Sequence, residues 1–310
     1  MRELMSAASE ASRDYPMFGI DLELAGLKKG KADIEAKAEL DRLNAESTYQ
    51  SALAEYRSST LGFYNEVIDA VYSAASAQLD AGIAELKLAN AAEDEKYAAL
   101  LFESGSSSEV ELKEAQIARK TAATDLKLAE RSLKAAAEAV SSTAGIAWKS
   151  ELVPAVPDFS PKTEVEAWLG KDTALSKARL AEKISALKTA GLAANAPKYD
   201  RRIQETELLK AKAAVIGAEE AGRQAFENAL KNLENQAAMM QIRLEECDLS
   251  ETSYQDSLKQ LESGLISASD VNLKSIAVLN ARKNLLQARK SYIKTVGSFK
   301  SAMGEDPAGL

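Results

Sequence analysis

Apolar residues recur along most of the chain at alternating steps of three and four, the 3.5-residue repeat of left-handed coiled coils. Two such stripes cover residues 122–140 and 68–100, and the second passes through Asn90. A third comprises Leu230, Leu233, Ala237, Met240, Leu244, Cys247, Glu251, Tyr254, Leu258 and Leu261. Stripes of this kind most simply form the contact faces of packed helices.

The last periodic stretch carries two apolar seams instead of one. The first is Leu279, Leu286 and Ile293, and the second is Leu285, Ala288, Tyr292, Thr295, Phe299 and Ala302. A helix with two seams packs against a neighbour on each side, so this one is expected inside a bundle or a barrel wall.

The six prolines all lie outside the long periodic stretches, as expected if those stretches are helices. The pattern predicts helices over residues 2–13, 16–44, 45–103, 107–142, 162–169, 173–192, 199–262 and 268–303. A medium, a long and a return helix therefore occur twice, which indicates an internal repeat. The predicted fold is all-α: two tandem repeats of long antiparallel coiled-coil hairpins.

Two similar stretches mark the predicted hairpin tips. They read "ESGSSSEVELK" from Glu103 and "ESGLISASDVNLK" from Glu262. Each has a glycine just past a long helix, Gly105 or Gly264, where a left-handed residue closes the last turn.

A capping box is expected to open each return helix. The serines at 106 and 267 are each followed three residues later by an acid, Glu109 or Asp270. The shared order of these residues favours a duplicated tip over two unrelated helix breaks.

This organisation resembles the TolC-like outer-membrane efflux family over nearly the whole chain. Residues 254–304 resemble the second family repeat along its length. Residues 14–40 resemble its first helix, with Tyr15 where Asn is usual, and residues 172–190 resemble the second copy of that helix.

The resemblance implies a homotrimer whose helical columns close into a twelve-column α-barrel, a duct that crosses the periplasm. It implies a first repeat at 1–150 with a tip near 103–109, an equatorial linker at 151–172, a second repeat at 173–304 with a tip near 262–270, and a tail at 305–310. Both tryptophans, Trp148 and Trp168, fall in the equatorial region that the resemblance implies.

The resemblance also implies that a periplasmic adaptor docks on the tips and connects them indirectly to an inner-membrane transporter, for drug efflux or type I-like secretion. The docking residues on the matching positions are Ser104, Gly105, Ser106, Ser263, Gly264 and Leu265.

The sequence departs from the family where two β-barrel hairpins are expected, near Asn44 and near Ala194. A membrane-spanning strand needs about 9–11 residues, and neither place has room for a pair. The start also lacks the apolar core of a signal peptide. We expect a duct portion from the periplasm or outer membrane that does not itself insert in a membrane. Its strands are missing either by natural divergence or by excision, and excision is favoured because it would remove the signal as well.

A second departure concerns the family's closed aperture. Asp270 matches the first of its two acids, but Leu273 stands at the second acid, and Leu261 and Ile266 replace the tyrosine and arginine of its latch. Three copies of Asp270 could form an acidic ring that favours cations, or Asp270 could simply cap its helix. The two roles are compatible.

Composition argues against other functions. The net charge is −8, and the sequence has no basic stripe that could neutralise the phosphates of a nucleic acid. With no histidine and the single cysteine Cys247 in a seam, neither a Ser-His-Asp triad nor a His/Cys zinc site can be built. No enzyme activity, cofactor or metal is expected. The acids at 93–95 and the lysine-rich run at 28–31 read as solvated helix faces.

Two alternatives stay open. One is a cytosolic coiled-coil scaffold whose seams pair with partner helices, without a channel. The other is the helical hairpin of an adaptor protein, which is disfavoured because an adaptor carries one hairpin flanked by strands. A signal peptide in the native gene would separate the first alternative from a duct.

Overall fold

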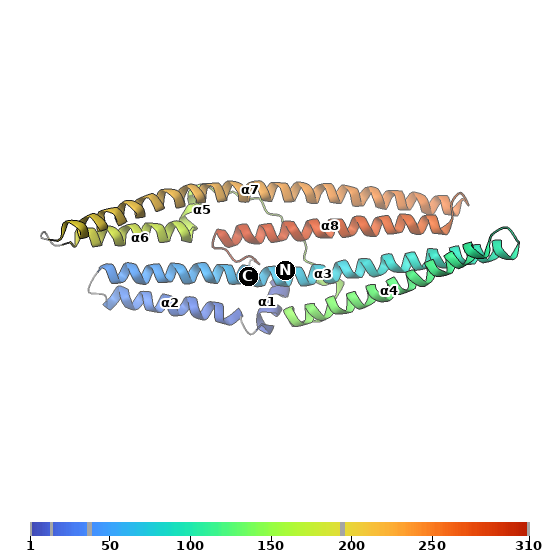
Figure 1. Cartoon of the computed structure of the whole chain (residues 1–310), viewed down its shortest axis with the longest axis horizontal. Coiled ribbons are helices and arrows are strands. Elements are labelled where there is room, and N and C mark those ends of the chain that lie inside the picture. Colours follow the sequence, from blue (N-terminus) through green and yellow to red (C-terminus); the bar gives the residue numbers. More distant parts are fainter. Residues whose placement is uncertain (1, 13–14, 36–38, 193–195, 309–310) are drawn as a thin grey trace. The chain divides into compact units, whose positions relative to one another are not determined.

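The computed structural model of the chain describes residues 2–12, 15–35, 39–192 and 196–308 (Figure 1). Within these ranges the only regular structure is helical, and no strand occurs. The elements are α1 (Arg2–Ala11), α2 (Tyr15–Glu35), α3 (Glu39–Glu103), α4 (Glu109–Ala144), the 3-10 helix η1 (Ser150–Leu152), α5 (Val165–Lys171), α6 (Thr173–Ala190), α7 (Lys198–Glu262) and α8 (Ala268–Ala302).

The helices confirm the all-α prediction and the order of medium, long and return helices. The two long helices α3 and α7 have the same length, 65 residues each. Both end where the sequence predicts, at Glu103 and Glu262, and α8 begins at Ala268 as expected.

The helix break predicted near Asn44 is wrong, because Asn44 lies inside α3. Thr48 Oγ1 donates to the carbonyl of Asn44 at 3.0 Å, and Ser51 Oγ donates to the carbonyl of Ser47 at 3.1 Å. These bonds within the helix satisfy the hydroxyls without ending it. The second expected place, Ala194, lies outside the described residues.

The chain folds into two compact units, and these do not coincide with the two sequence repeats. One unit contains residues 1–65, 157–234 and 294–310, and the other contains 66–156 and 235–293. Each unit therefore takes segments from both sequence repeats. The repeat boundaries at 150 and 173 stay a prediction, since they describe duplicated sequence instead of contacts.

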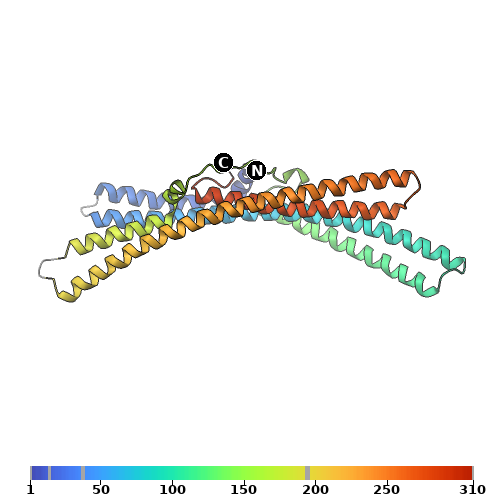
Figure 2. The same ribbon diagram turned by 90° about the horizontal axis from the view of Figure 1, so that it is seen from above.

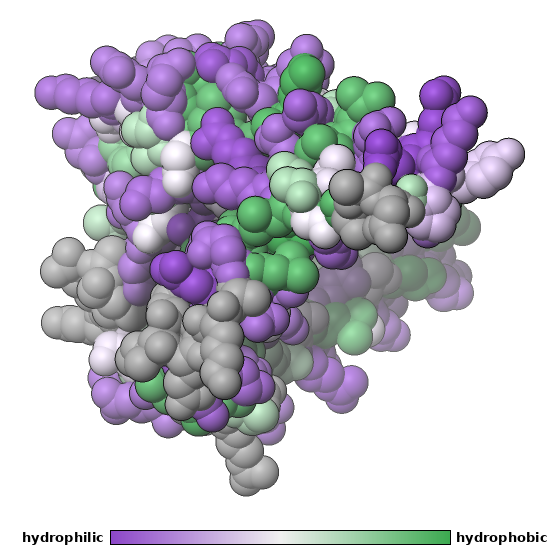
Figure 3. Space-filling view, turned by 90° about the vertical axis from the view of Figure 1, so that its left-hand side faces the viewer, coloured by the Kyte–Doolittle hydropathy of each residue, from purple (hydrophilic) through white to green (hydrophobic). Residues whose placement is uncertain are grey.

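In the first unit, four helices form a row in the order α2, α3, α6, α7 (Figures 1 and 2). Helix α2 rests on α3 through Lys29, which pairs with Glu46 at 2.6 Å and lies 5.0 Å from the ring centre of Tyr49. Figure 3 looks at this row of helices end-on. In this view, hydrophobic residues are visible mainly in the spaces between hydrophilic ones. Helices α2 and α7 are the edges of the row.

An aromatic cluster forms the core beside this row. Trp168 of α5 contacts Phe226 of α7 and Phe299 of α8, with ring centres 5.6 and 5.3 Å apart. Phe159 of the linker adds a further edge contact to Phe299 at 5.7 Å. The cluster joins segments far apart in sequence, which the seams alone did not predict.

In the second unit the row runs α4, α3, α8, α7 (Figures 1 and 2). Cys247 of α7 packs on Ala281 and Leu285 of α8. On the other side of α8, Leu279 lies against Gly82 of α3. The prediction that the two seams of α8 pack against a neighbour on each side is confirmed.

We expect Gly297→Val to destabilise the first unit by about 1–3 kcal/mol, because Gly297 of α8 has no room for a side chain. A Cβ at this position would lie 2.5 Å from Cε1 of Tyr64, whose ring is buried on α3. Denaturant unfolding of the variant measures the loss. The matched control is Gly217→Val on α7, where nothing lies within 4 Å of the added Cβ. Equal stability of the two variants would contradict the close approach.

Candidate functional site: the hairpin tips and the edge helices

Both hairpin tips end their long helix with the same hydrogen-bonded turn. At the first, Gly105 N–H donates to the Phe102 carbonyl at 3.0 Å and Ser106 N–H to the Leu101 carbonyl at 2.8 Å. Gly105 has φ +73°, the left-handed conformation that glycine adopts without strain. This is the Schellman motif, which satisfies the last carbonyls of α3.

The second tip repeats that turn atom for atom. Gly264 N–H donates to the Leu261 carbonyl and Leu265 N–H to the Gln260 carbonyl, both at 2.9 Å. Gly264 has φ +69°. The predicted left-handed glycines are therefore confirmed at both tips.

The capping box predicted for the second return helix is confirmed. Asp270 N–H donates to Ser267 Oγ at 3.1 Å, and Ser267 N–H donates to Asp270 Oδ2 at 3.0 Å. Ser267 Oγ–H also donates to the same carboxylate oxygen at 2.7 Å. Hydrogen bonds from the side chain and backbone of Ser267 lower the pKa of Asp270. The capping role of Asp270 is thus present in the structure.

The capping box predicted for the first return helix is wrong by two residues. The cap is Ser108 with Glu111, not Ser106 with Glu109: Ser108 N–H donates to Glu111 Oε2 at 2.7 Å, and Glu111 N–H to Ser108 Oγ at 3.3 Å. Ser106 cannot form a capping box, because its N–H is already bonded to the carbonyl of Leu101 in the preceding turn. The backbone and side chain of Ser108 lower the pKa of Glu111.

The corrected cap makes the two tips equal in length. In each, two residues lie between the left-handed glycine and the capping serine: between Gly105 and Ser108, and between Gly264 and Ser267. From the sequence, Glu109 and Val110 of the first tip were matched with Asp270 and Val271 of the second tip. That match requires a gap of two residues in the first tip. An ungapped alignment from the glycine would have found the cap, since it matches Glu111 with Asp270.

The tip side chains are exposed, and one is strongly apolar. Leu265 is 75% exposed and occupies the turn of the second tip, where the first tip has Ser106. The predicted docking residues Ser104 and Ser263 are also exposed. The first tip is therefore polar, while the second presents a leucine to solvent.

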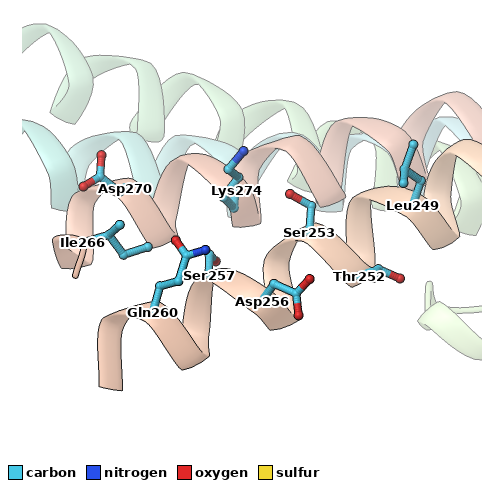
Figure 4. A pocket seen from close by; sticks show the side chains of 9 residues that line it. All are labelled: Leu249, Thr252, Ser253, Asp256, Ser257, Gln260, Ile266, Asp270 and Lys274. Carbon is cyan, nitrogen blue, oxygen red and sulfur yellow. The ribbon is translucent and has the colours of Figure 1, made fainter. Parts of the chain in front are cut away.

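A shallow polar groove of about 610 Å³ lies between α7 and α8 behind the second tip (Figure 4). Asp270 and Lys274 line it from α8, and Ser253, Asp256 and Gln260 line it from α7. Asp256 is paired with Lys259 at 2.9 Å. Within the described residues no group of acids and cysteine is placed to hold a metal ion.

The edge helices of both units expose apolar stripes. In the first unit the α2 stripe is Met17, Ile20, Leu24 and Leu27, and the α7 stripe is Tyr199, Ile203, Leu209 and Ile216. In the second unit α4 exposes Val110, Ile117 and Leu128, and α7 exposes Met239, Ile242 and Leu249. On α2 the stripe lies opposite the face that carries Lys29, because the steps of three and four keep it on one side. The apolar stripes identified from the sequence did not include these residues, so sequence reasoning missed the exposed edges.

Several solved structures of membrane proteins are similar to this chain. They include the CmeC outer-membrane channel of Campylobacter jejuni, at 11% identity, covering 99% of this chain and 86% of that one, with a TM-score of 0.59. The outer-membrane protein VceC of Vibrio cholerae matches at 13% identity, covering 98% and 96%, with a TM-score of 0.59. A membrane protein of Pseudomonas aeruginosa matches at 14% identity, covering 100% and 91%, with a TM-score of 0.64.

This chain has the TolC-like fold. The resemblance drawn from the sequence is confirmed for the fold over nearly the whole chain. No protein-family model and no curated protein sequence matches it. None of the described helices is both long and apolar enough to cross a bilayer.

The TolC-like fold of this chain carries different residues at the expected latch. Ile266 lines the groove behind the second tip, and Leu273 is exposed on α8. Leu261 instead supplies a carbonyl to the Schellman turn. Leu261 and Ile266 therefore lack the polar groups of the tyrosine and arginine of the implied latch, and Leu273 lacks the carboxylate of the second aperture acid.

Proposed function

We propose that this chain is the helical wall of a TolC-like exit duct of the periplasm and outer membrane, which assembles as a homotrimer and serves efflux or secretion. The TolC-like fold along nearly the whole chain is the observation that carries the proposal. The neighbouring structures are channel proteins, which fits a transport role better than catalysis.

The exposed edges support assembly. Each row of helices has an apolar stripe on both of its edge helices, α2 and α7 in the first unit and α4 and α7 in the second. Contact between α7 of one copy and α2 and α4 of the next would bury these stripes. Such a head-to-tail contact closes into a ring when the rotation per copy divides a full turn. A lone copy would leave the stripes in water.

The assembly is tested by mass. We expect light scattering to give the mass of three chains, and the double variant Leu24→Glu with Leu27→Glu to give one chain, because two buried charges at an interface oppose association. Both side chains are exposed in the single chain, so its helicity should not change. The matched control is Leu187→Glu, an exposed leucine on the inner helix α6, which should stay trimeric. A wild type that stays monomeric at high concentration would contradict the duct and favour the scaffold alternative.

We further propose that the tips dock a periplasmic adaptor through Ser104, Gly105, Ser106, Ser263, Gly264 and Leu265. The support is the repeated Schellman turn, which presents the same backbone shape twice, and the exposed Leu265. An acidic ring of Asp270 copies stays part of this proposal, compatible with its cap.

The docking is tested with Leu265→Asp. We expect it to weaken binding of an adaptor's helical hairpin by about tenfold or more, since a central apolar contact of an interface typically contributes at least ~1.4 kcal/mol. Calorimetry with the purified hairpin measures this. Leu273→Asp is the control, because Leu273 is also exposed on the same hairpin but lies outside the turn. Unchanged affinity for Leu265→Asp would argue against docking at this tip, whatever the state of assembly.

A further inference from the structure

The two hairpins of the second unit part before their tips. From residue 91 to residue 103 of α3 and from 109 to 139 of α4, no side chain is buried. In Figure 2 the α3–α4 hairpin and the α7–α8 hairpin diverge toward their tips. Closer to the middle of α3, the side chains of Val67, Ile68 and Val71 are fully buried. The packed contact between the hairpins therefore has a definite end.

Asn90 lies at that end and is buried to 9% exposure within the apolar stripe of α3. Its Nδ2 donates to the carbonyl of Ser269 at 3.3 Å, and its Oδ1 accepts from Asn272 Nδ2 at 2.7 Å. Ser269 belongs to the first turn of α8, directly behind the second tip. Both ends of the amide are thus bonded to α8.

Asn90, Asn272 and the Ser269 carbonyl together form the Asn90 node. Among the polar contacts described between α3 and α8, this node lies nearest to the tips. Lys290 pairs with Asp69 at 3.5 Å and Lys283 pairs with Asp80 at 2.6 Å, before Asn272 meets Asn90. Residue numbers increase along α3 from one contact to the next while they decrease along α8, as expected for two antiparallel helices. The two ion pairs are partly exposed, and pairs of that kind contribute little. Of these three contacts, the one made by Asn90 is the one with a buried polar side chain, that of Asn90 itself.

We propose that the node of Asn90, Asn272 and the Ser269 carbonyl fixes the axial register of α8 on α3 and sets the point beyond which the two tips move independently. A heptad stripe of small and aliphatic residues accepts shifted registers at similar energy. A buried asparagine in such a stripe disfavours them, because a shift leaves its amide unpaired, and it does so at a cost in stability. The inference holds whether or not the chain forms a duct.

The test is the distance between the tips. Spin labels at Ser104→Cys and Ser263→Cys, in a Cys247→Ala background diluted with unlabelled chain, report this distance by pulsed electron resonance. We expect Asn90→Leu to broaden the distribution or add a population displaced by up to about 10 Å, the rise of one heptad. Its melting temperature should stay equal or rise, since a leucine at this position buries apolar surface.

Two further variants separate register from packing. Asn272→Leu removes one bond of the node from the other helix and should broaden the distribution in the same direction. Asp80→Asn breaks an ion pair on the same interface and should leave it unchanged. A distribution that stays narrow in both leucine variants, with helicity intact, would overturn the proposal. So would an equal broadening in Asp80→Asn, because any polar contact would then suffice.

Discussion

Trp168→Ala is expected to lower the free energy of unfolding by about 3–5 kcal/mol, the usual cost of emptying a large aromatic site in a core. The Trp168 side chain is only 8% exposed and contacts the rings of Phe226 and Phe299. These phenylalanines come from α7 and α8, so the indole joins three helices of the first unit. Urea unfolding followed by far-ultraviolet circular dichroism measures the change without relying on tryptophan fluorescence.

Trp148→Ala is the matched control for this prediction. Trp148 also belongs to the connecting region, but it is only half-buried and lies in an irregular segment. Its loss should cost clearly less than that of Trp168. If the two variants are equally destabilised, the aromatic cluster is not the main core of the first unit. Phe226→Leu should fall between them, because it retains apolar volume beside the indole.

The helices of this chain could be predicted from sequence because their signals are local and repeated. A heptad stripe identifies a helix through every turn, and the ends at Glu103 and Glu262 carry a glycine two residues on. The prediction at Asn44 was wrong because short polar residues serve either as caps or as hydroxyls bonded within a helix. Which role they take depends on the neighbouring helix, which the sequence does not display.

The tip residues show how far the site could be predicted. The left-handed glycines follow from steric limits on the backbone, so Gly105 and Gly264 were identified correctly. The cap of α4 was not, since three consecutive serines offer three candidates and only the preceding turn selects Ser108. The exposed apolar stripes of the edge helices could not be identified from the sequence either, because buried and exposed stripes have the same period. Which seam is covered is a property of the packed row.

The two tryptophans make the same point for the core. Both were assigned to one equatorial region by resemblance, yet Trp168 is packed and Trp148 is half-buried. The surroundings of Trp168 come from segments of α7 and α8 far along the chain. Long-range contact of this kind leaves no periodic trace in the sequence.

Raising the pH from 10 toward 12 is expected to remove about 2–3 kcal/mol of stability through Tyr72 alone. Burial raises the pKa of the Tyr72 hydroxyl to about 12, an effect that the nearby positive charge of Arg289 only partly offsets. The side chain is 2% exposed on α3, and its hydroxyl donates to the carbonyl of Pro154 at 3.4 Å. The neutral form is therefore favoured in the folded chain.

The sign follows from comparing the two states. Below pH 10 the hydroxyl is neutral whether folded or unfolded, so the stabilisation is fully present. Between pH 10 and 12 the unfolded chain releases the proton first, and stability falls by roughly 1.4 kcal/mol by pH 11. Other tyrosines and lysines titrate in the same range, so the measured quantity is the difference between wild type and Tyr72→Phe at each pH.

At pH 7 Tyr72→Phe loses one long hydrogen bond and should be less stable than wild type by about 1 kcal/mol or less. Above pH 10 the order should reverse, because phenylalanine has no proton to release. Tyr97→Phe is the control for loss of a tyrosine hydroxyl from the same helix, because Tyr97 is 65% exposed and its hydroxyl is not buried against the linker. If the difference between wild type and Tyr72→Phe stays constant up to pH 11, the hydroxyl reaches water in the folded chain, and the packing of the linker over α3 at Pro154 is looser than its 3.4 Å contact indicates.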